Sequence, residues 1–244
     1  MAGPSFPDEF NIADYFLYQR LEEGLTSKKA VLFGDHSYTY GDVANRSKAL
    51  SRRLHQLGVC REQRTYIVLS DTPAFAWSFF GALTHGSVVA MGNPVSKADD
   101  LAYVLNYSRA AVLITETRVA EQLANSLLNN PYLKAVLLVP SAATGDDCEA
   151  AIEIPQALQN TPFVVESLTQ AISQGRDLED PQLPPIRRDD TAIWLFTSGS
   201  TGRPKAAVHT QRDFAFNTEV YAKGTVQYQR DDITVSVPRL FFGY

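Results

Sequence analysis

Apolar residues follow two spacings along the chain, one typical of buried strands and one typical of helices. Short runs of aliphatic and β-branched residues predict strands over 64–69, 87–91, 111–115 and 135–139. Between these runs, apolar residues recur every three or four positions and predict helices over 72–83, 99–107 and 118–128. Strands that alternate with helices in this way are typical of a parallel sheet covered by helices. The pattern therefore predicts an α/β fold with mostly parallel sheets.

The regions on either side of this alternation carry patterns of their own. Ahead of it, the spacing predicts a short amphipathic helix over 12–21, a hairpin over 30–40 that turns at Gly34-Asp35, and a helix over 42–57. Behind it, the small and acidic residues of 140–162 predict an exposed excursion, followed by a helix over 165–174, a Pro-rich link over 180–186 and an apolar strand over 190–196. No internal repeat interrupts this order.

Composition and charge exclude several classes of protein. The chain has 244 residues, 45% hydrophobic and 20% charged, which is typical of a folded globular protein and excludes disordered and collagen-like chains. Its net charge of −5, without a basic run of five or more, argues against nucleic acid as a partner. Cys60 and Cys148 form neither a disulfide framework nor a CxxC metal pair. With no export signal in 1–11, and with 74–83 too short to cross a bilayer, we expect a cytoplasmic protein.

The residues that follow the strand at 190–196 have the composition of a phosphate-binding loop. Residues 197–205 read Thr-Ser-Gly-Ser-Thr-Gly-Arg-Pro-Lys, so six of the nine are Gly, Ser or Thr. Glycine lets the backbone N–H groups approach an anion, and hydroxyls and an ammonium group complete the envelope around phosphate oxygens. An ordinary surface loop is the alternative interpretation. A Walker loop is excluded, because Arg203-Pro204 separate Gly202 from Lys205 and Ala206 follows.

Residues 196–205 resemble the phosphate-loop signature of the adenylate-forming superfamily, which includes acyl- and aryl-CoA synthetases, peptide-synthetase adenylation domains and luciferases. The stretches 10–16, 71–73 and 240–244 look like benzoate-CoA ligases, so the resemblance covers nearly the whole chain. It implies that residues 1–244 are the N-terminal part of the AMP-binding (adenylation) domain, the large domain of these enzymes. The C-terminal domain is then absent.

The resemblance also implies a reaction. In this superfamily a carboxylate attacks the α-phosphate of Mg-ATP to give an acyl-adenylate and pyrophosphate, and the CoA thiol then displaces AMP. The expected ligands are ATP, Mg²⁺, CoA as co-substrate and an aromatic carboxylic acid, either benzoate or a substituted benzoate such as 2-aminobenzoate. The residues expected at the ATP phosphates are Thr197, Ser198, Gly199, Ser200, Thr201, Gly202 and Lys205.

The main catalytic groups of the superfamily belong to its later sequence. The magnesium ligand, the ribose aspartate and the catalytic lysine are not found before Tyr244, so no residue of this chain is assigned a catalytic or metal-binding role. We expect the chain alone to be inactive. Two further interpretations stay open, namely an aryl adenylating enzyme that loads a carrier protein and a non-catalytic nucleotide-binding module.

Three positions depart from the family pattern. Ala206 replaces the usual Gly after the lysine, and Gln211 replaces a usual His, which leaves the ATP geometry near Gln211 open. His209 is interpreted as an ordinary strand residue. At the chain end, Gly243 replaces the Ala of the Phe-Phe-Ala-Tyr stretch that forms one wall of the aryl pocket in benzoate-CoA ligases. The pocket residues implied are Phe242, Gly243 and Tyr244, with a slot about one methyl wider, whereas one of Phe241 and Phe242 is expected in the core.

Overall fold

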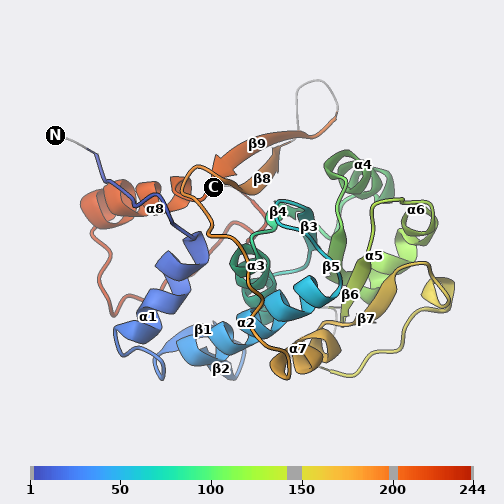
Figure 1. Cartoon of the computed structure of the whole chain (residues 1–244), viewed down its shortest axis with the longest axis horizontal. Helices are drawn as coiled ribbons and strands as arrows, with labels where there is room; N and C mark the ends of the chain where they lie inside the picture. Colours follow the sequence, from blue (N-terminus) through green and yellow to red (C-terminus); the bar gives the residue numbers. More distant parts are fainter. Residues whose placement is uncertain (1–2, 142–149, 198–202, 243–244) are drawn as a thin grey trace.

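A mostly parallel sheet forms the centre of the molecule (Figure 1). The structure, a computed structural model, describes residues 3–141, 150–197 and 203–242. Within these residues seven strands are ordered β7-β6-β5-β3-β4-β8-β9, and every neighbouring pair is parallel except β8 and β9. The strands are β3 (Arg64–Val68), β4 (Val88–Met91), β5 (Val112–Glu116), β6 (Ala135–Val139), β7 (Val164–Ser167), β8 (Thr191–Thr197) and β9 (Lys205–Thr210). This topology confirms the predicted α/β fold.

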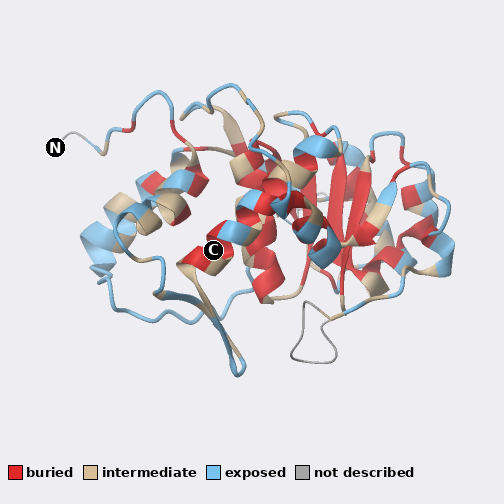
Figure 2. Ribbon diagram, turned by 60° about the horizontal axis from the view of Figure 1, so that its bottom comes forward, coloured by how far each residue is buried: buried red, intermediate tan, exposed pale blue. Residues whose placement is uncertain are grey.

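Helices cover both faces of the sheet. One face is covered by α2 (Tyr40–Gln56), α3 (Pro73–His85) and α7 (Leu168–Arg176). The other face is covered by α4 (Ala98–Ser108), α5 (Thr117–Gln122) and α6 (Ala124–Leu128). Successive strand residues point to opposite faces, so Ile67 packs in the first layer whereas Tyr66 and Val68 pack in the second. Figure 2 shows the consequence, because the strands and the inner sides of the helices are buried.

The N-terminal region packs outside the sheet and follows the predicted order closely. The π-helix η1 (Asp14–Tyr18) and α1 (Gln19–Glu22) are followed by the antiparallel hairpin of β1 (Lys29–Phe33) and β2 (His36–Thr39). Asn11 accepts a hydrogen bond from the backbone N–H of Ala13 at 2.8 Å, just ahead of η1. The helix predicted from residue 42 begins at Tyr40, because Thr39 and Asp42 form a capping box.

Two predicted helices differ from the structure. The helix predicted over 165–174 is wrong at its start, because residues 164–167 form β7 and pair in parallel with β6. The helix α7 begins only after Ser167, whose side chain accepts a hydrogen bond from the N–H of Gln170 at 3.0 Å. The helix predicted over 118–128 is divided into α5 and α6 at Leu123. These boundaries depend on strand pairing and packing that periodicity alone does not reveal.

The remaining segments lie at the surface. Of the predicted excursion 140–162, residues 142–149 lie outside the described part of the chain, whereas 150–162 are mostly exposed and anchored by buried Leu158 in the 3-10 helix η3 (Gln156–Leu158). After β9 the chain forms α8 (Asp213–Asn217) and the π-helix η4 (Thr218–Val226), and the described residues 227–242 that follow form neither helix nor strand. Within the described residues, no helix is long and apolar enough to cross a membrane.

Candidate functional site

The predicted phosphate loop joins β8 to β9 at one end of an antiparallel hairpin. Thr197, the last residue of β8, lies opposite Lys205, the first residue of β9, and both are exposed. The next pair along the hairpin is Phe196 and Ala206. Ser198, Gly199, Ser200, Thr201 and Gly202 lie outside the described residues. The structure therefore places a hydroxyl and an ammonium group side by side where the loop leaves the sheet and returns to it.

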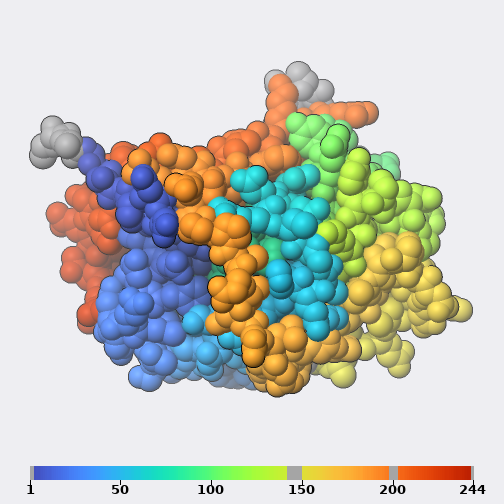
Figure 3. Space-filling view, viewed as in Figure 1, coloured from blue at the N-terminus to red at the C-terminus, as the bar shows by residue number. Residues whose placement is uncertain are grey.

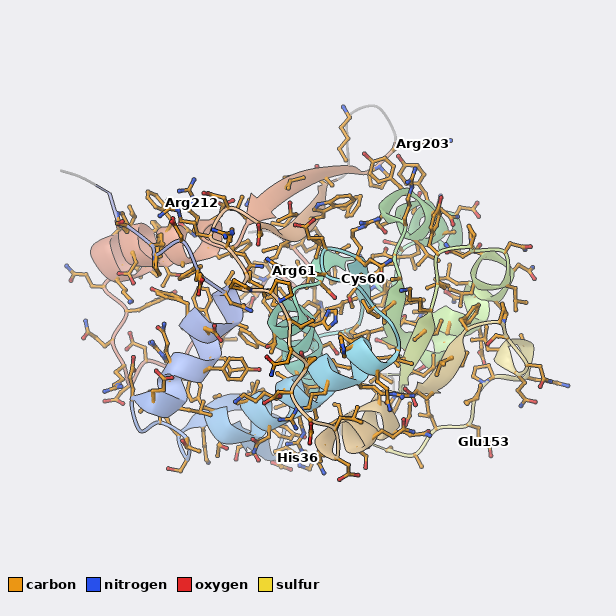
Figure 4. The ribbon with its side chains drawn as sticks, viewed as in Figure 1. His36, Cys60, Arg61, Glu153, Arg203 and Arg212 are labelled. Atoms are coloured by element: carbon orange, nitrogen blue, oxygen red, sulfur yellow. The ribbon has the colours of Figure 1, made fainter. Side chains whose placement is uncertain are left out.

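The end of the hairpin packs against aromatic residues of α4. The Arg203 guanidinium lies over the ring of Tyr103, 5.1 Å from its centroid, and Figure 4 shows Arg203 beside this helix. One turn along α4, Tyr107 stacks on Tyr103 at 5.6 Å and meets the ring of Phe196 edge-on at 6.3 Å. Figure 3 shows this end of the hairpin rising from the surface next to α4. Sequence reasoning missed both tyrosines, although their spacing of four places them on one side of a helix.

A buried carboxylate lies at the same edge of the sheet as Thr197. Glu116, at the end of β5, accepts hydrogen bonds from the backbone N–H of Ser70 at 3.0 Å and from its hydroxyl at 2.6 Å, and pairs with Arg118 at 3.2 Å. Ser70 follows β3, and the connections from β3 and β5 leave in opposite directions, toward β4 and β6. Open α/β sheets bind ligands where their connections diverge in this way. Sequence reasoning missed this cluster, because its members are separated by 46 residues.

Two stretches that the resemblance singled out separately meet at the end of β3. The Asp71 carboxylate accepts a hydrogen bond from the backbone N–H of Leu240 at 3.0 Å and pairs with Arg239 at 3.3 Å. Phe241 is buried against the core, whereas Phe242 is 50% exposed, with the two ring centroids 4.8 Å apart. Gly243 and Tyr244 lie outside the described residues. The aryl pocket predicted from Phe242, Gly243 and Tyr244 stays a prediction.

The structure explains the residues at and next to the hairpin that depart from the family pattern, Gln211 and Ala206. Gln211 follows β9 at the end opposite the phosphate loop, and its side chain is buried. Its amide oxygen accepts a hydrogen bond from the backbone N–H of Ile12 at 3.0 Å, so this side chain holds the N-terminal segment. His209 is a residue of β9, as expected, with its Nδ1 3.6 Å from the Asp213 carboxylate. Ala206 is accommodated because its backbone lies in a strand.

A model of the family described as "AMP-binding enzyme" matches residues 19–244. The chain belongs to this family. The curated relatives of this AMP-binding enzyme include the benzoate–CoA ligase of Thauera aromatica, 28% identical over 239 residues that cover 98% of this chain and 41% of the ligase. The 4-hydroxybenzoate–CoA/benzoate–CoA ligase of Rhodopseudomonas palustris is 26% identical, over 97% of this chain and 40% of the ligase. The chain thus spans about two fifths of the length of these relatives.

Solved structures agree with the fold of this AMP-binding enzyme. The crystal structure of a benzoate CoA ligase from Burkholderia xenovorans LB400 is similar with a TM-score of 0.74 and 26% identity, over 96% of this chain and 41% of that one. An anthranilate CoA ligase in complex with anthranoyl-AMP gives a TM-score of 0.82 at 23% identity, over 99% and 42% of the two chains. The family resemblance of residues 196–205 is therefore confirmed, and the arrangement of the sheet is that of adenylate-forming domains.

Two described residues of this AMP-binding enzyme have side chains of the kind that bind phosphate. Thr197 and Lys205 offer a hydroxyl and a cation of the kind that phosphate oxygens require. Among the residues with a described position, no three His, Cys, Asp or Glu side chains gather as a metal site would require. Among the described residues, the end of the hairpin is thus the candidate for contact with phosphate, and none of them form a cluster that would hold Mg²⁺.

Proposed function

We propose that the complete protein is an ATP-dependent aryl-CoA ligase. It activates benzoate or a substituted benzoate such as 2-aminobenzoate through an acyl-adenylate and transfers the acyl group to CoA. The observation that carries this proposal is the hairpin of β8 and β9, which brings Thr197 and Lys205 together at the carboxyl end of a parallel strand in an AMP-binding enzyme. The benzoate–CoA ligases among its relatives support the aromatic substrate.

Each end of the hairpin has a separate role in this proposal. Lys205 and the loop residues 197–202 hold the β- and γ-phosphates of Mg-ATP, because an ammonium group and hydroxyl and backbone donors offset the phosphate charge. Gln211 lies at the other end of β9 and anchors Ile12, so it takes no part in binding these phosphates. The contact of Arg203 with Tyr103 holds this end of the hairpin against α4.

The first test removes the cation from the loop in the complete protein. Lys205→Ala should raise the KM for ATP and slow ATP–pyrophosphate exchange by about 10- to 150-fold, because a hydrogen bond to a charged group contributes about 1.5 to 3 kcal/mol. Lys29→Ala is the matched control, since Lys29 is an exposed lysine of the distant strand β1. If Lys205→Ala left ATP–pyrophosphate exchange unchanged, Lys205 would not belong to the ATP site.

The second test concerns the acid. We propose that Gly243 leaves room for a small substituent on the ring. Gly243→Ala in the complete protein should change the ratio of kcat/KM for 2-aminobenzoate over benzoate by about 10- to 200-fold, the effect of one methylene-sized change in a pocket. A ratio that stays constant would contradict the assignment of Phe242, Gly243 and Tyr244 to the aryl pocket.

The third test uses the 244-residue chain itself. We propose that it does not form acyl-CoA, because the resemblance assigns the groups for magnesium, ribose and thioester formation to later sequence. The measurement is CoA-dependent release of AMP with benzoate as the acid. Turnover comparable to that of a full-length ligase would contradict this proposal and would require catalytic groups within residues 1–244.

A further inference from the structure

The end of β3 leads into a tight turn that carries Asp71. The N–H of Thr72 donates a hydrogen bond to the carbonyl of Ser70 at 2.8 Å, and α3 begins at the next residue, Pro73. Ser70 is itself held by the buried carboxylate of Glu116, which accepts hydrogen bonds from its N–H at 3.0 Å and from its hydroxyl at 2.6 Å. The Asp71 side chain, 25% exposed, therefore extends from a backbone that is fixed on both sides.

A second turn, far along the chain, meets the Asp71 carboxylate. The N–H of Phe242 donates to the carbonyl of Arg239 at 2.9 Å, which closes a turn over residues 239–242, the 239–242 turn. The Asp71 Oδ1 accepts a hydrogen bond from the N–H of Leu240 at 3.0 Å, and its Oδ2 lies 3.3 Å from the Arg239 guanidinium. One carboxylate thus holds the first two residues of this turn.

Two contacts fix the 239–242 turn against the rest of the chain. Phe241 is buried in the core layer that contains α3, and the hydrogen bond to Asp71 holds the backbone one residue earlier. The preceding chain adds little, because residues 233–238 have no backbone–backbone hydrogen bond with any other described residue. The position from which Phe242 leaves the turn therefore depends on Asp71.

We propose that Asp71 is a positioning residue for the acid substrate. This inference rests on the proposed function, in which Phe242, Gly243 and Tyr244 belong to the aryl pocket. Asp71 itself does not touch the substrate, but its bond to Leu240 sets where the pocket residues begin. A carboxylate suits this role, because its two oxygens can accept from a backbone N–H and a guanidinium at the same time.

The test is steady-state kinetics of the complete protein with benzoate and ATP. Asp71→Ala should raise the KM for benzoate about tenfold, as expected for the loss of one hydrogen bond to a carboxylate, and change the KM for ATP by less than about twofold. Asp71→Asn should keep the KM for benzoate within about threefold of the unmodified value, because its amide oxygen still accepts the N–H of Leu240. Asp180→Ala is the matched control, since Asp180 also pairs with an arginine, Arg52, and should leave both KM values unchanged.

The two KM values separate positioning from a loss of folded protein. Fewer folded molecules would lower kcat and leave the KM for benzoate and the KM for ATP as they were. Amide hydrogen exchange adds a readout that needs no catalysis. Residues 239–242 should exchange faster in Asp71→Ala than in the unmodified protein, and Asp71→Asn should restore slow exchange.

The unmodified protein distinguishes failure of this inference from failure of the proposed function. If it activates benzoate while Asp71→Ala leaves the KM for benzoate unchanged, or raises both KM values equally, the inference is overturned and the ligase activity stands. An Asp71→Asn variant as impaired as Asp71→Ala would also overturn it. An unmodified complete protein that activates no aromatic acid would overturn the proposed function, and the inference would fall with it.

Discussion

The strand β5 and residues 233–237 have similar sequences and opposite environments. Val112, Leu113 and Ile114 are fully buried, with β3 and β6 on either side and helices on both faces of the sheet. Ile233 and Val235 have the same β-branched character, and more than three quarters of each is exposed. The difference shows that β-branched residues form a strand where other strands and helices pack against them. Their β propensity does not create a strand by itself.

The first prediction contrasts the same substitution in the two regions. Ile114→Ala should lower the free energy of unfolding by about 4 kcal/mol, because it removes buried methyl and methylene groups and leaves a cavity between the sheet and its helices. Ile233→Ala should change it by less than about 0.5 kcal/mol, as is usual for exposed positions. Urea denaturation of the unmodified chain and of both variants measures these two changes in the free energy of unfolding. Similar losses from both substitutions would show that Ile233 is packed against the rest of the chain.

Much of the fold was predictable because burial leaves a strong signal. The strands at β3, β4, β5 and β6 were found within one or two residues, since strands buried on both faces appear as continuous apolar runs. The strand β7 was missed, because only Val164–Ser167 pair with β6 and the helix α7 follows immediately. A short strand at the sheet edge has too few residues to show its own period.

The candidate site was only partly predictable. The motif placed Thr197 and Lys205 in one loop after a strand, whereas the antiparallel pairing that sets them opposite each other was not predicted. The link between Glu116 and Ser70 and the link between Gln211 and Ile12 join residues 46 and 199 positions apart. Such contacts depend on sheet order and on the path of the N-terminal segment, neither of which a local pattern contains.

The second prediction concerns a buried histidine at the end of α3. Burial, with a smaller contribution from nearby His55, lowers the pKa of His85 to about 4 from its ordinary value of 6.5. The folded chain therefore keeps His85 neutral while the unfolded chain takes up a proton. This difference stabilises the folded chain fully above pH 6.5. As the pH falls from 6.5 toward 4, the free energy of unfolding drops by about 3 kcal/mol.

Urea midpoints between pH 7 and pH 4 measure this loss. His85→Gln should remove its share of the pH dependence, whereas His36→Gln should keep it, since His36 is exposed on β2. The comparison between buried and exposed regions then extends from apolar to titratable side chains. An unchanged slope in His85→Gln would show that His85 accepts a proton as readily in the folded chain as in the unfolded one.

The third prediction compares two carboxylates that both pair with arginine. Glu116 is buried and accepts hydrogen bonds from Ser70 as well as pairing with Arg118, whereas Glu23 is exposed between Arg20 and Arg230. Glu116→Gln should lower the free energy of unfolding by about 2 kcal/mol, because it weakens charge-assisted hydrogen bonds that water does not replace. Glu23→Gln should lower the free energy of unfolding by less than about 0.5 kcal/mol, because solvent already screens the ion pairs of Glu23. Equal costs would mean that water reaches the Ser70–Glu116 cluster.

The smallest expected effect tests the one boundary that local sequence determines. The side chain of Thr39 accepts a hydrogen bond from the N–H of Asp42 at 3.1 Å, and Asp42 accepts one from the N–H of Thr39 at 2.9 Å. Thr39→Ala should lower stability by about 1 kcal/mol and speed amide exchange in the first turn of α2, whereas Thr39→Ser should keep both near their original values. A strand such as β5 depends on distant partners, but this helix start depends on residues three positions apart. If Thr39→Ala leaves exchange unchanged, packing of α2 against α3 and α7 holds the first turn, and even this boundary is set by the tertiary fold.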